Sequence, residues 1–108
     1  MERLLHYVWK YKLYAATSLA TTDGRPVQVI DPGMQNTDAG PDFFNAKIKI
    51  DETLWAGSVE IHDKSSDWLL HHHETDKAYD GVILHITGVD DFQPFRTNGE
   101  PVPQMLLT

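Results

Sequence analysis

The sequence predicts an α+β fold, in which a mixed β-sheet of about five to seven strands is accompanied by an N-terminal helix and a second short helix. Apolar residues recur at helical spacing near the N-terminus, alternate with polar residues in the middle of the chain, and form a nearly continuous run from residue 82. The length of 108 residues fits one domain, so we expect residues 1–108 to form a single α/β domain. The apolar run at 105–108 is typical of an interrupted strand. We therefore expect this domain to be the N-terminal fragment of a longer chain.

The first third of the chain predicts a helix, a hairpin and a loop. Residues 2 to about 15 form the helix, because five apolar side chains recur at helical spacing: Leu4, Leu5, Val8, Trp9 and Leu13. Residues 18–22 and 25–31 favour strands on either side of Asp23-Gly24, a dipeptide that accepts the positive φ of a tight turn. The polar stretch 33–41 has little to bury, so it predicts a surface loop that ends at Asp42.

The middle of the chain predicts a hairpin with one buried face. Its first strand is residues 44–50, where the apolar positions alternate with polar ones: Phe44, Ala46, Ile48 and Ile50. The return strand is residues 54–62, in which Val59 and Ile61 share one face while Glu60 and His62 share the other. The pattern therefore places a carboxylate and an imidazole side by side.

The last third predicts a short helix, a buried strand and an edge hairpin. Ser65, Ser66 or Asp67 can cap a helix that reaches about His73. The run at 82–86 is typical of a central strand covered on both faces. Asn98-Gly99 predicts a further turn, and three prolines confine its arms to the edge of the sheet: Pro94, Pro101 and Pro103.

Composition excludes several classes of function. Nine Lys and Arg against sixteen Asp and Glu give a net charge of −7, which counts against nucleic acid as a partner of this segment. The absence of cysteine excludes disulfides, thiolate zinc sites and cysteine nucleophiles, and is compatible with a cytoplasmic location, which we expect by default. No apolar run approaches the length of a membrane span. Kinase, serine-hydrolase and dinucleotide-binding motifs are also missing.

The densest group of candidate site residues joins the loop at 40–43 to the return strand. Asp42 and Glu60 lie on adjacent strands and can converge on a divalent cation such as Mg²⁺ or Mn²⁺, with the Ile61 carbonyl as a further oxygen ligand. His62 lies on the same face and could orient or deprotonate an attacking water. The alternative is structural, because Gly-Pro-Asp is a common turn and Glu60 and His62 could form an exposed polar face.

A second group follows the predicted short helix. On a helix, either His72 or His73 could pair with Asp76, whereas His71 and His73 cannot point the same way. The run lacks the spacing of the zinc-protease helix motif, so a solvated or capping helix end is the alternative. His85 lies within the most apolar strand, which favours a hydrogen-bonded core histidine.

The sequence resembles the domain of unknown function (DUF) 2851 family, bacterial proteins of several hundred residues, and covers only the N-terminal part of their length. The resemblance implies no activity. The segments that carry it are Leu5–Lys10, Asn36–Ala46, Trp55–His62, Ser65–Trp68 and Tyr79–His85.

A second resemblance concerns fold and mechanism. The predicted order of elements is similar to the αβββαβ core of the PD-(D/E)XK nucleases, which is restriction-endonuclease-like. In that superfamily two acids bind Mg²⁺, and a lysine two residues after the second acid helps to position the attacking water. The resemblance implies that Asp42 and Glu60 are metal ligands, that Ile61 offers its carbonyl, and that His62 stands at the lysine position. The replacement of lysine by histidine departs from the pattern.

These observations leave three hypotheses for the function. The first is a Mg²⁺- or Mn²⁺-dependent phosphodiesterase built on Asp42, Glu60 and His62, with nucleic acid as its substrate. The second is a non-catalytic binding or assembly module, in which the same residues form a structural polar network and the sheet edge docks the remainder of the full-length chain. The third is a metal hydrolase of another substrate class, built on His62, His71 or His73, and Asp76.

Overall fold

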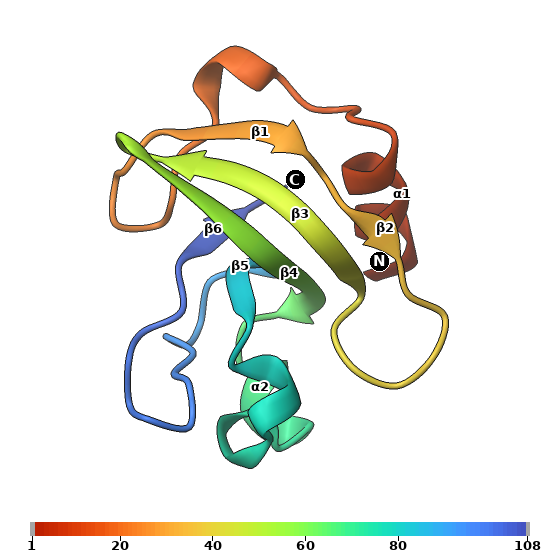
Figure 1. The fold of residues 1–108 in the computed structure, drawn as a ribbon, viewed down its shortest axis with the longest axis vertical. Coiled ribbons are helices and arrows are strands. Elements are labelled where there is room, and N and C mark those ends of the chain that lie inside the picture. The colour runs from red at the N-terminus through yellow and green to blue at the C-terminus, as the bar shows by residue number, and fades with distance from the viewer. Residues whose placement is uncertain (1, 108) are drawn as a thin grey trace.

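A mixed, strongly curled sheet forms the body of the protein (Figure 1). The computed structural model describes residues 2–107. Its strands follow the order β1-β3-β4-β5-β6, and β2 also pairs with β3. Strand β3 is antiparallel to β1, β2 and β4, whereas β5 is parallel to β4 and β6. The helices are α1 (Glu2–Lys10) and α2 (Asp67–Leu70), and the strands are β1 (Val27–Asp31), β2 (Met34–Gln35), β3 (Phe43–Ile50), β4 (Thr53–Lys64), β5 (Val82–Val89) and β6 (Gln104–Leu106). The predicted α+β class is confirmed, while Met1 and Thr108 lie outside the described residues.

Helix α1 lies against β4 and β5 and closes one face of the sheet. Leu5 and Trp9 are one turn apart and buried in the main core, which gives the helix its apolar face. Trp9 Nε1 also donates a hydrogen bond to the Pro32 carbonyl at 3.0 Å. The predicted extension of this helix to residue 15 is wrong. Lys12 has a φ of 56°, a left-handed conformation that ends the helix, and Leu13 is exposed.

A β-bulge alters the predicted alternation of β3. The register shifts between Phe43 and Ala46, and Asn45 between them has a φ of 58°. As a result Phe43 is buried and Phe44 is partly exposed, the reverse of the two-residue pattern, while Ala46, Ile48 and Ile50 are buried as predicted. The bulge begins at Phe43, the residue after Asp42, so it shapes the start of the strand that follows this carboxylate.

Strands β4 and β5 present two faces of different chemistry. Their parallel register pairs Ile61 with Ile86 in the main core and Glu60 with His85 on the opposite face. Trp68 of α2 packs edge-on against His85 at a ring-centroid distance of 5.1 Å. Polar side chains of β4 and β5 are therefore enclosed between the sheet and the α2 region, where they lie away from solvent.

The short helix after β4 ends earlier than predicted. Helix α2 stops at Leu70, and His72 has a φ of 58°, which interrupts any helical continuation to residue 73. Two 3₁₀ turns, His73–Thr75 and Lys77–Tyr79, lead on to β5.

The two outer hairpins are shorter than predicted. The turn at Asp23-Gly24 has one isolated bridge, Ala20 to Pro26, and β1 pairs with β3 instead of forming a ladder with residues 18–22. The Asn98-Gly99 turn likewise has one bridge, Phe95 to Pro101. Within the described range, no helix combines the length and the apolar character required to cross a membrane.

Gly57 allows β4 to pass close to the segment that leads into β5. A Cβ at this position would lie 2.6 Å from the Gly81 carbonyl oxygen and 2.7 Å from Cγ2 of Ile83. We expect Gly57→Ala to lower the free energy of unfolding by about 1–3 kcal/mol, because backbone must move to admit the methyl group. Urea unfolding of the original chain and of the variant measures this difference in free energy. Gly81→Ala is the matched control, since a Cβ there meets nothing within 4 Å, and equal losses for both variants would contradict the explanation.

Candidate functional site

Asp42 and Glu60 meet where β3 begins beside β4. The Asp42 backbone N–H donates to Glu60 Oε1 at 3.0 Å, and the Ile61 backbone N–H donates to Asp42 Oδ2 at 2.9 Å. These reciprocal bonds bridge the two strands next to the bulge in β3, where the regular ladder is interrupted. Each carboxyl group is therefore positioned by the backbone of the other's strand.

Asp42 also faces helix α1. His6 Nε2 lies 3.4 Å from Asp42 Oδ2, and both side chains are only partly exposed. The neighbouring Asp42 carboxylate raises the pKa of His6 above its usual value, against the effect of burial. Burial acts to raise the pKa of Asp42, but the neighbouring His6 imidazole and the hydrogen bond from the Ile61 N–H outweigh it and leave that pKa below the usual value. Asp42 is thus the ionised member of the carboxyl pair.

Glu60 is the protonated member of the pair. Burial, followed by the charge of Asp42, raises the pKa of Glu60 to about 10. Its side chain is 6% exposed, and its Oε2 atom lies 2.9 Å from His73 Nε2 and 3.3 Å from His62 Nε2. Glu60 therefore connects the Asp42 carboxylate to a group of imidazole rings.

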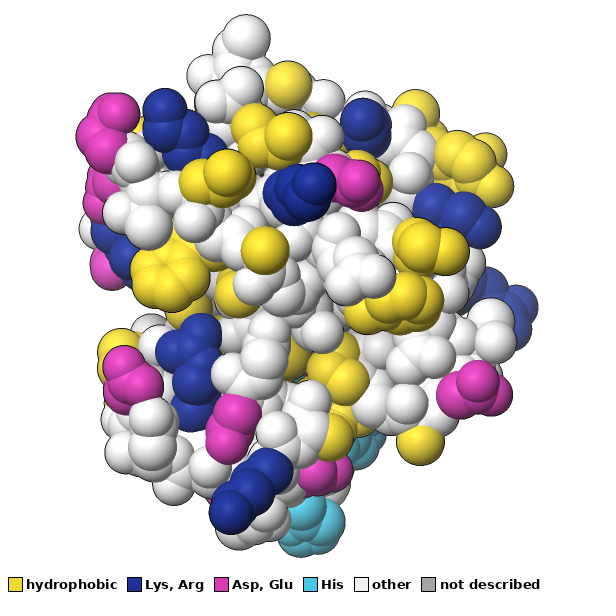
Figure 2. Space-filling view, in the orientation of Figure 1, with side chains coloured by type: hydrophobic (Ala, Val, Ile, Leu, Met, Phe, Trp, Pro, Cys, Tyr) yellow, Lys and Arg dark blue, Asp and Glu magenta, His cyan; other side chains and the backbone are white. Residues whose placement is uncertain are grey.

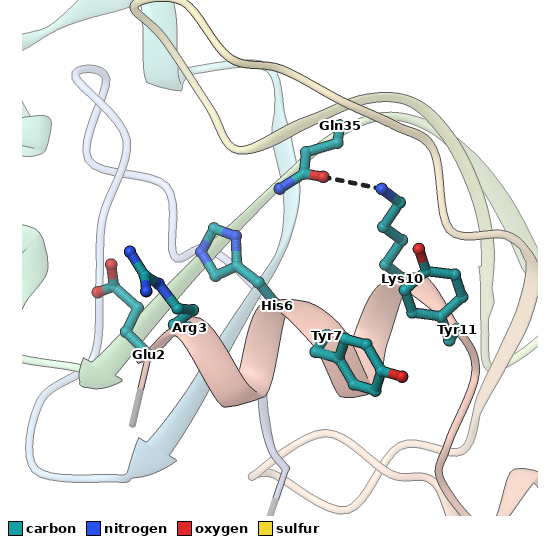
Figure 3. A pocket seen from close by; sticks show the side chains of 7 residues that line it. All are labelled: Glu2, Arg3, His6, Tyr7, Lys10, Tyr11 and Gln35. Carbon is teal, nitrogen blue, oxygen red and sulfur yellow. Dashed lines mark hydrogen bonds between the residues drawn. The ribbon is translucent and has the colours of Figure 1, made fainter.

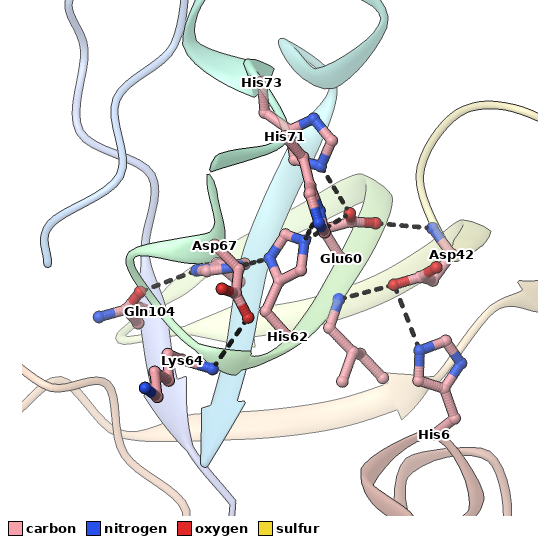
Figure 4. Close-up of polar contacts among 11 residues, drawn as sticks. His6, Asp42, Glu60, His62, Lys64, Asp67, His71, His73 and Gln104 are labelled. Atoms are coloured by element: carbon pink, nitrogen blue, oxygen red, sulfur yellow. Dashed lines mark hydrogen bonds and ion pairs between the residues drawn. The ribbon is translucent and has the colours of Figure 1, made fainter. Parts of the chain in front are cut away.

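Three histidines gather beyond Glu60. His62, His71 and His73 each place one ring nitrogen within 4.8 Å of the nitrogens of the other two. His62 Nε2 and His71 Nδ1 are 3.1 Å apart. The left-handed conformation of His72 turns the chain so that His71 and His73 both face His62 (Figure 4). Histidine side chains reach the surface at this end of the molecule (Figure 2).

A chain of hydrogen bonds fixes the tautomers of two buried histidines. Gln104 Nε2 donates to the Asp90 carboxylate and the Phe92 carbonyl, so Gln104 Oε1 faces His85 Nδ1 at 2.8 Å and accepts its proton. His85 Nε2 is then an acceptor, and it receives the Nδ1 proton of His62 at 2.7 Å. The free lone pair of His62 is consequently on Nε2, which points toward Glu60 and His71.

Burial keeps these imidazoles neutral. It lowers the pKa of His62 to about 3, assisted by the neighbouring rings of His85 and His73. Burial likewise lowers the pKa of His73 to about 4 and that of His85 to about 4. Neutral imidazole is the form that accepts a proton or binds a metal ion, so the cluster is chemically competent for either role at neutral pH.

A family model with the description "Protein of unknown function (DUF2851)" matches residues 2–108. The chain belongs to this family. No curated protein and no solved structure matches this chain.

Three of the predicted site residues lie together in the structure. Asp42, Glu60 and His62 lie in one connected group, but Glu60 and His62 are buried, so the alternative of an exposed polar face is wrong. His85 is a hydrogen-bonded core histidine, as predicted. The predicted pairing of Asp76 with His72 or His73 on a helix is wrong, because Asp76 accepts a hydrogen bond from the Ala78 N–H and begins a 3₁₀ turn.

Sequence reasoning missed the joint approach of His71 and His73 to His62. It also missed Gln104, whose role depends on β6 lying beside β5. The sequence does contain a signal for the approach of His71 and His73, namely the three consecutive histidines at 71–73. Its use requires a helix that ends at Leu70, before these residues. Gln104 has no local signal, since only the sheet order brings it to His85.

A pocket of about 460 Å³ lies along the outer face of α1. It is lined by Glu2, Arg3, His6, Tyr7, Lys10, Tyr11 and Gln35 (Figure 3). His6 lies between this pocket and the carboxyl pair, through its contact with Asp42. Lys10 Nζ donates to Gln35 Oε1 at 3.1 Å, which holds one cationic group over the pocket. A polar, partly cationic surface thus adjoins the candidate site.

Proposed function

We propose that this domain is a divalent-metal-dependent phosphodiesterase whose metal ligands are Asp42, Glu60 and the Ile61 carbonyl. The observation that carries the proposal is the convergence of the two carboxyl groups, of which Glu60 retains a proton because it is buried beside the charge of Asp42. Carboxylate and carbonyl oxygens are the donors that Mg²⁺ and Mn²⁺ prefer. In a strand, the N–H and C=O of one residue face the same side, so the Ile61 carbonyl accompanies the N–H that binds Asp42.

The residues around the carboxyl pair suit a phosphodiester. A divalent cation in this position supplies Lewis-acid stabilisation of a phosphoryl oxygen. Arg3, His6 and Lys10 line the adjoining pocket and offer positive charge to phosphate, in contrast to the net charge of the whole chain. On the face that Figure 2 draws, Lys and Arg are scattered among acidic and apolar side chains, so the proposal relies on this local pocket.

His62 supplies the remaining role in this proposal. Its Nε2 lone pair is directed toward Glu60 by the hydrogen bonds to His85 and Gln104. It can therefore accept a hydrogen bond from a water beside Glu60 and orient that water for attack. Lysine, which stands at this position in the PD-(D/E)XK nucleases, also helps to position the water. Replacement of this lysine by His62 therefore changes the chemical group but preserves its role.

The experiment is a calorimetric titration of Mn²⁺ and of Mg²⁺ into the chain, followed by a plasmid-nicking assay with each metal. We expect Asp42→Asn and Glu60→Gln to weaken Mn²⁺ binding by at least about tenfold and to abolish nicking, because each removes a carboxyl ligand, and Glu60 becomes anionic when the metal ion displaces its proton. Asp38→Asn is the matched control, since Asp38 is an exposed carboxylate in the loop before Asp42. It should bind Mn²⁺ like the original chain.

The second candidate function is a non-catalytic binding or assembly module. Two observations favour it. The carboxyl pair already bridges β3 and β4 by backbone hydrogen bonds. An apolar groove of about 440 Å³ also runs between α1 and the end of β5, with Leu4, Val8 and Val89 among its lining residues. Absence of Mn²⁺ binding at millimolar concentration, together with lower stability of Asp42→Asn, would favour this module over the enzyme.

A further inference from the structure

The three clustered histidines form a second group of potential ligands, distinct in its donor atoms from the Asp42 and Glu60 carboxyl pair. Ligand atoms at 2.0–2.1 Å from a tetrahedral ion lie about 3.3 Å from one another. His62 Nε2 and His71 Nδ1 are 3.1 Å apart, and the nitrogens of all three rings lie within 4.8 Å. Small side-chain rotations therefore suffice to direct the three nitrogens at one ion.

The hydrogen bonds behind His62 match those of metal-binding histidines. Such a ligand donates its other ring N–H to an acceptor, which fixes the tautomer and the ring plane. His62 Nδ1 donates to His85 Nε2, and His85 Nδ1 donates in turn to Gln104 Oε1. His62 Nε2 is thus presented with its lone pair toward His71, as a ligand atom requires.

The other two rings combine rigidity with access. His73 is buried and stacks on Tyr79, with ring centroids 3.6 Å apart and planes inclined by 15°. Trp68 packs edge-on against the same His73 ring. His71 is exposed, so it forms the solvent side of the group and gives an ion a path of entry.

Glu60 supplies an oxygen at the inner end of the group. Its Oε2 atom is 2.9 Å from His73 Nε2 and 3.3 Å from His62 Nε2. Three imidazoles and one carboxylate are the donor set of zinc-type ions, whereas Mg²⁺ prefers oxygen ligands throughout.

We propose that His62, His71 and His73 bind a zinc-type transition-metal ion, with Glu60 as its fourth protein contact. This centre goes beyond the proposed phosphodiesterase, because it uses imidazole nitrogens and does not require Asp42. Both roles use the Glu60 carboxyl group and Nε2 of His62, so a His62 that holds this ion is not the group that orients water.

The test is a titration of Zn²⁺ into the metal-free chain, with Co²⁺ as a second probe. We expect one equivalent of Zn²⁺ to bind, and we expect Co²⁺ to give the intense visible absorption of a tetrahedral nitrogen site. His71→Ala should weaken Zn²⁺ binding by about 10- to 100-fold and remove the Co²⁺ band. Because His71 is exposed, this variant should retain the unfolding midpoint of the metal-free chain. An unchanged midpoint would show that the weaker Zn²⁺ binding comes from loss of a ligand and not from loss of the fold.

His72→Ala is the matched control. His72 is also exposed and lies between the two proposed ligands in sequence, but it is not one of the three clustered rings. It should keep the original Zn²⁺ affinity. Equal weakening by His71→Ala and His72→Ala, or no binding of Zn²⁺ to the original chain, overturns the proposal. Asp42→Asn distinguishes the two sites, because this variant should keep the original Zn²⁺ affinity whether or not the Mn²⁺ proposal holds.

Discussion

Acid is expected to unfold the metal-free chain steeply between about pH 6.5 and pH 4.5. Burial lowers the pKa of His62 to about 3, and those of His73 and His85 to about 4. In the unfolded chain these rings have their ordinary pKa near 6.5, so below that pH they are protonated while the rings of the folded chain stay neutral. Stability is therefore lost as the pH falls below 6.5. Each ring contributes at most about 1.4 kcal/mol per pH unit.

Glu60 acts in the opposite direction. Its folded pKa is about 10, so above about pH 4.5 it stays protonated while the unfolded chain ionises. Its contribution falls with rising pH by about 1.4 kcal/mol per unit until the folded group ionises. The raised pKa of His6 has the same sign, since its stabilisation is lost as the pH rises through that pKa. Near pH 5 the net slope then approaches about 3 kcal/mol per pH unit, and maximum stability falls near neutral pH.

The measurement is a series of urea unfolding curves between pH 4.5 and pH 9 with a chelator present. Glu60→Gln should flatten the decline above pH 7 and leave the acid decline in place, because the amide does not titrate. Stability that remained constant from pH 7 to pH 5 would show that the buried histidines are protonated in the folded chain, contrary to the expectation.

Removal of the Trp68 side chain is expected to cost about 3–5 kcal/mol of unfolding free energy. Trp68 is fully buried, and its Nε1 donates to the Phe95 carbonyl at 3.1 Å. It also packs edge-on against His73 and His85. Trp68→Ala therefore opens a cavity beside the imidazoles and releases the contacts that orient two of them. Denaturant unfolding at neutral pH measures the loss.

Trp55→Ala provides the comparison for this variant. Trp55 belongs to β4 but is 45% exposed, so its truncation should cost about 1 kcal/mol or less. The two substitutions remove the same atoms, so their difference reports the effect of burial together with that of the Trp68 hydrogen bond. Similar losses at both positions would be inconsistent with Trp68 as a support of the histidine cluster.

Much of the fold was predictable from local pattern because burial is periodic along its strands. The alternation at 46–50 identifies β3, and the apolar run at 82–86 identifies β5. The pattern failed at Phe43, where the bulge at Asn45 exchanges the two faces. It also failed beyond Lys10, because the left-handed Lys12 ends the helix although an apolar residue follows at Leu13.

The candidate site was predictable only in part. The spacing of Asp42 and Glu60 on the two arms of a hairpin indicates their proximity, because adjacent strands bring such positions together. The approach of His71 and His73 depends on one residue, His72, in a left-handed conformation that is uncommon for any residue other than glycine. The part played by Gln104 depends on the order of strands in the sheet, which no short pattern encodes.

The position of Gln104 on β6 has a consequence for the lifetime of the histidine geometry. Strand β6 has three residues and pairs with β5 at one end of the described sheet order, so it is a segment that opens more readily than the central strands. Each opening removes the acceptor of the His85 Nδ1 proton. His85 is then free to change tautomer, and its Nε2 no longer fixes the proton of His62 on Nδ1. Opening of β6 thus limits how long the His62 Nε2 lone pair stays directed toward Glu60 and His71.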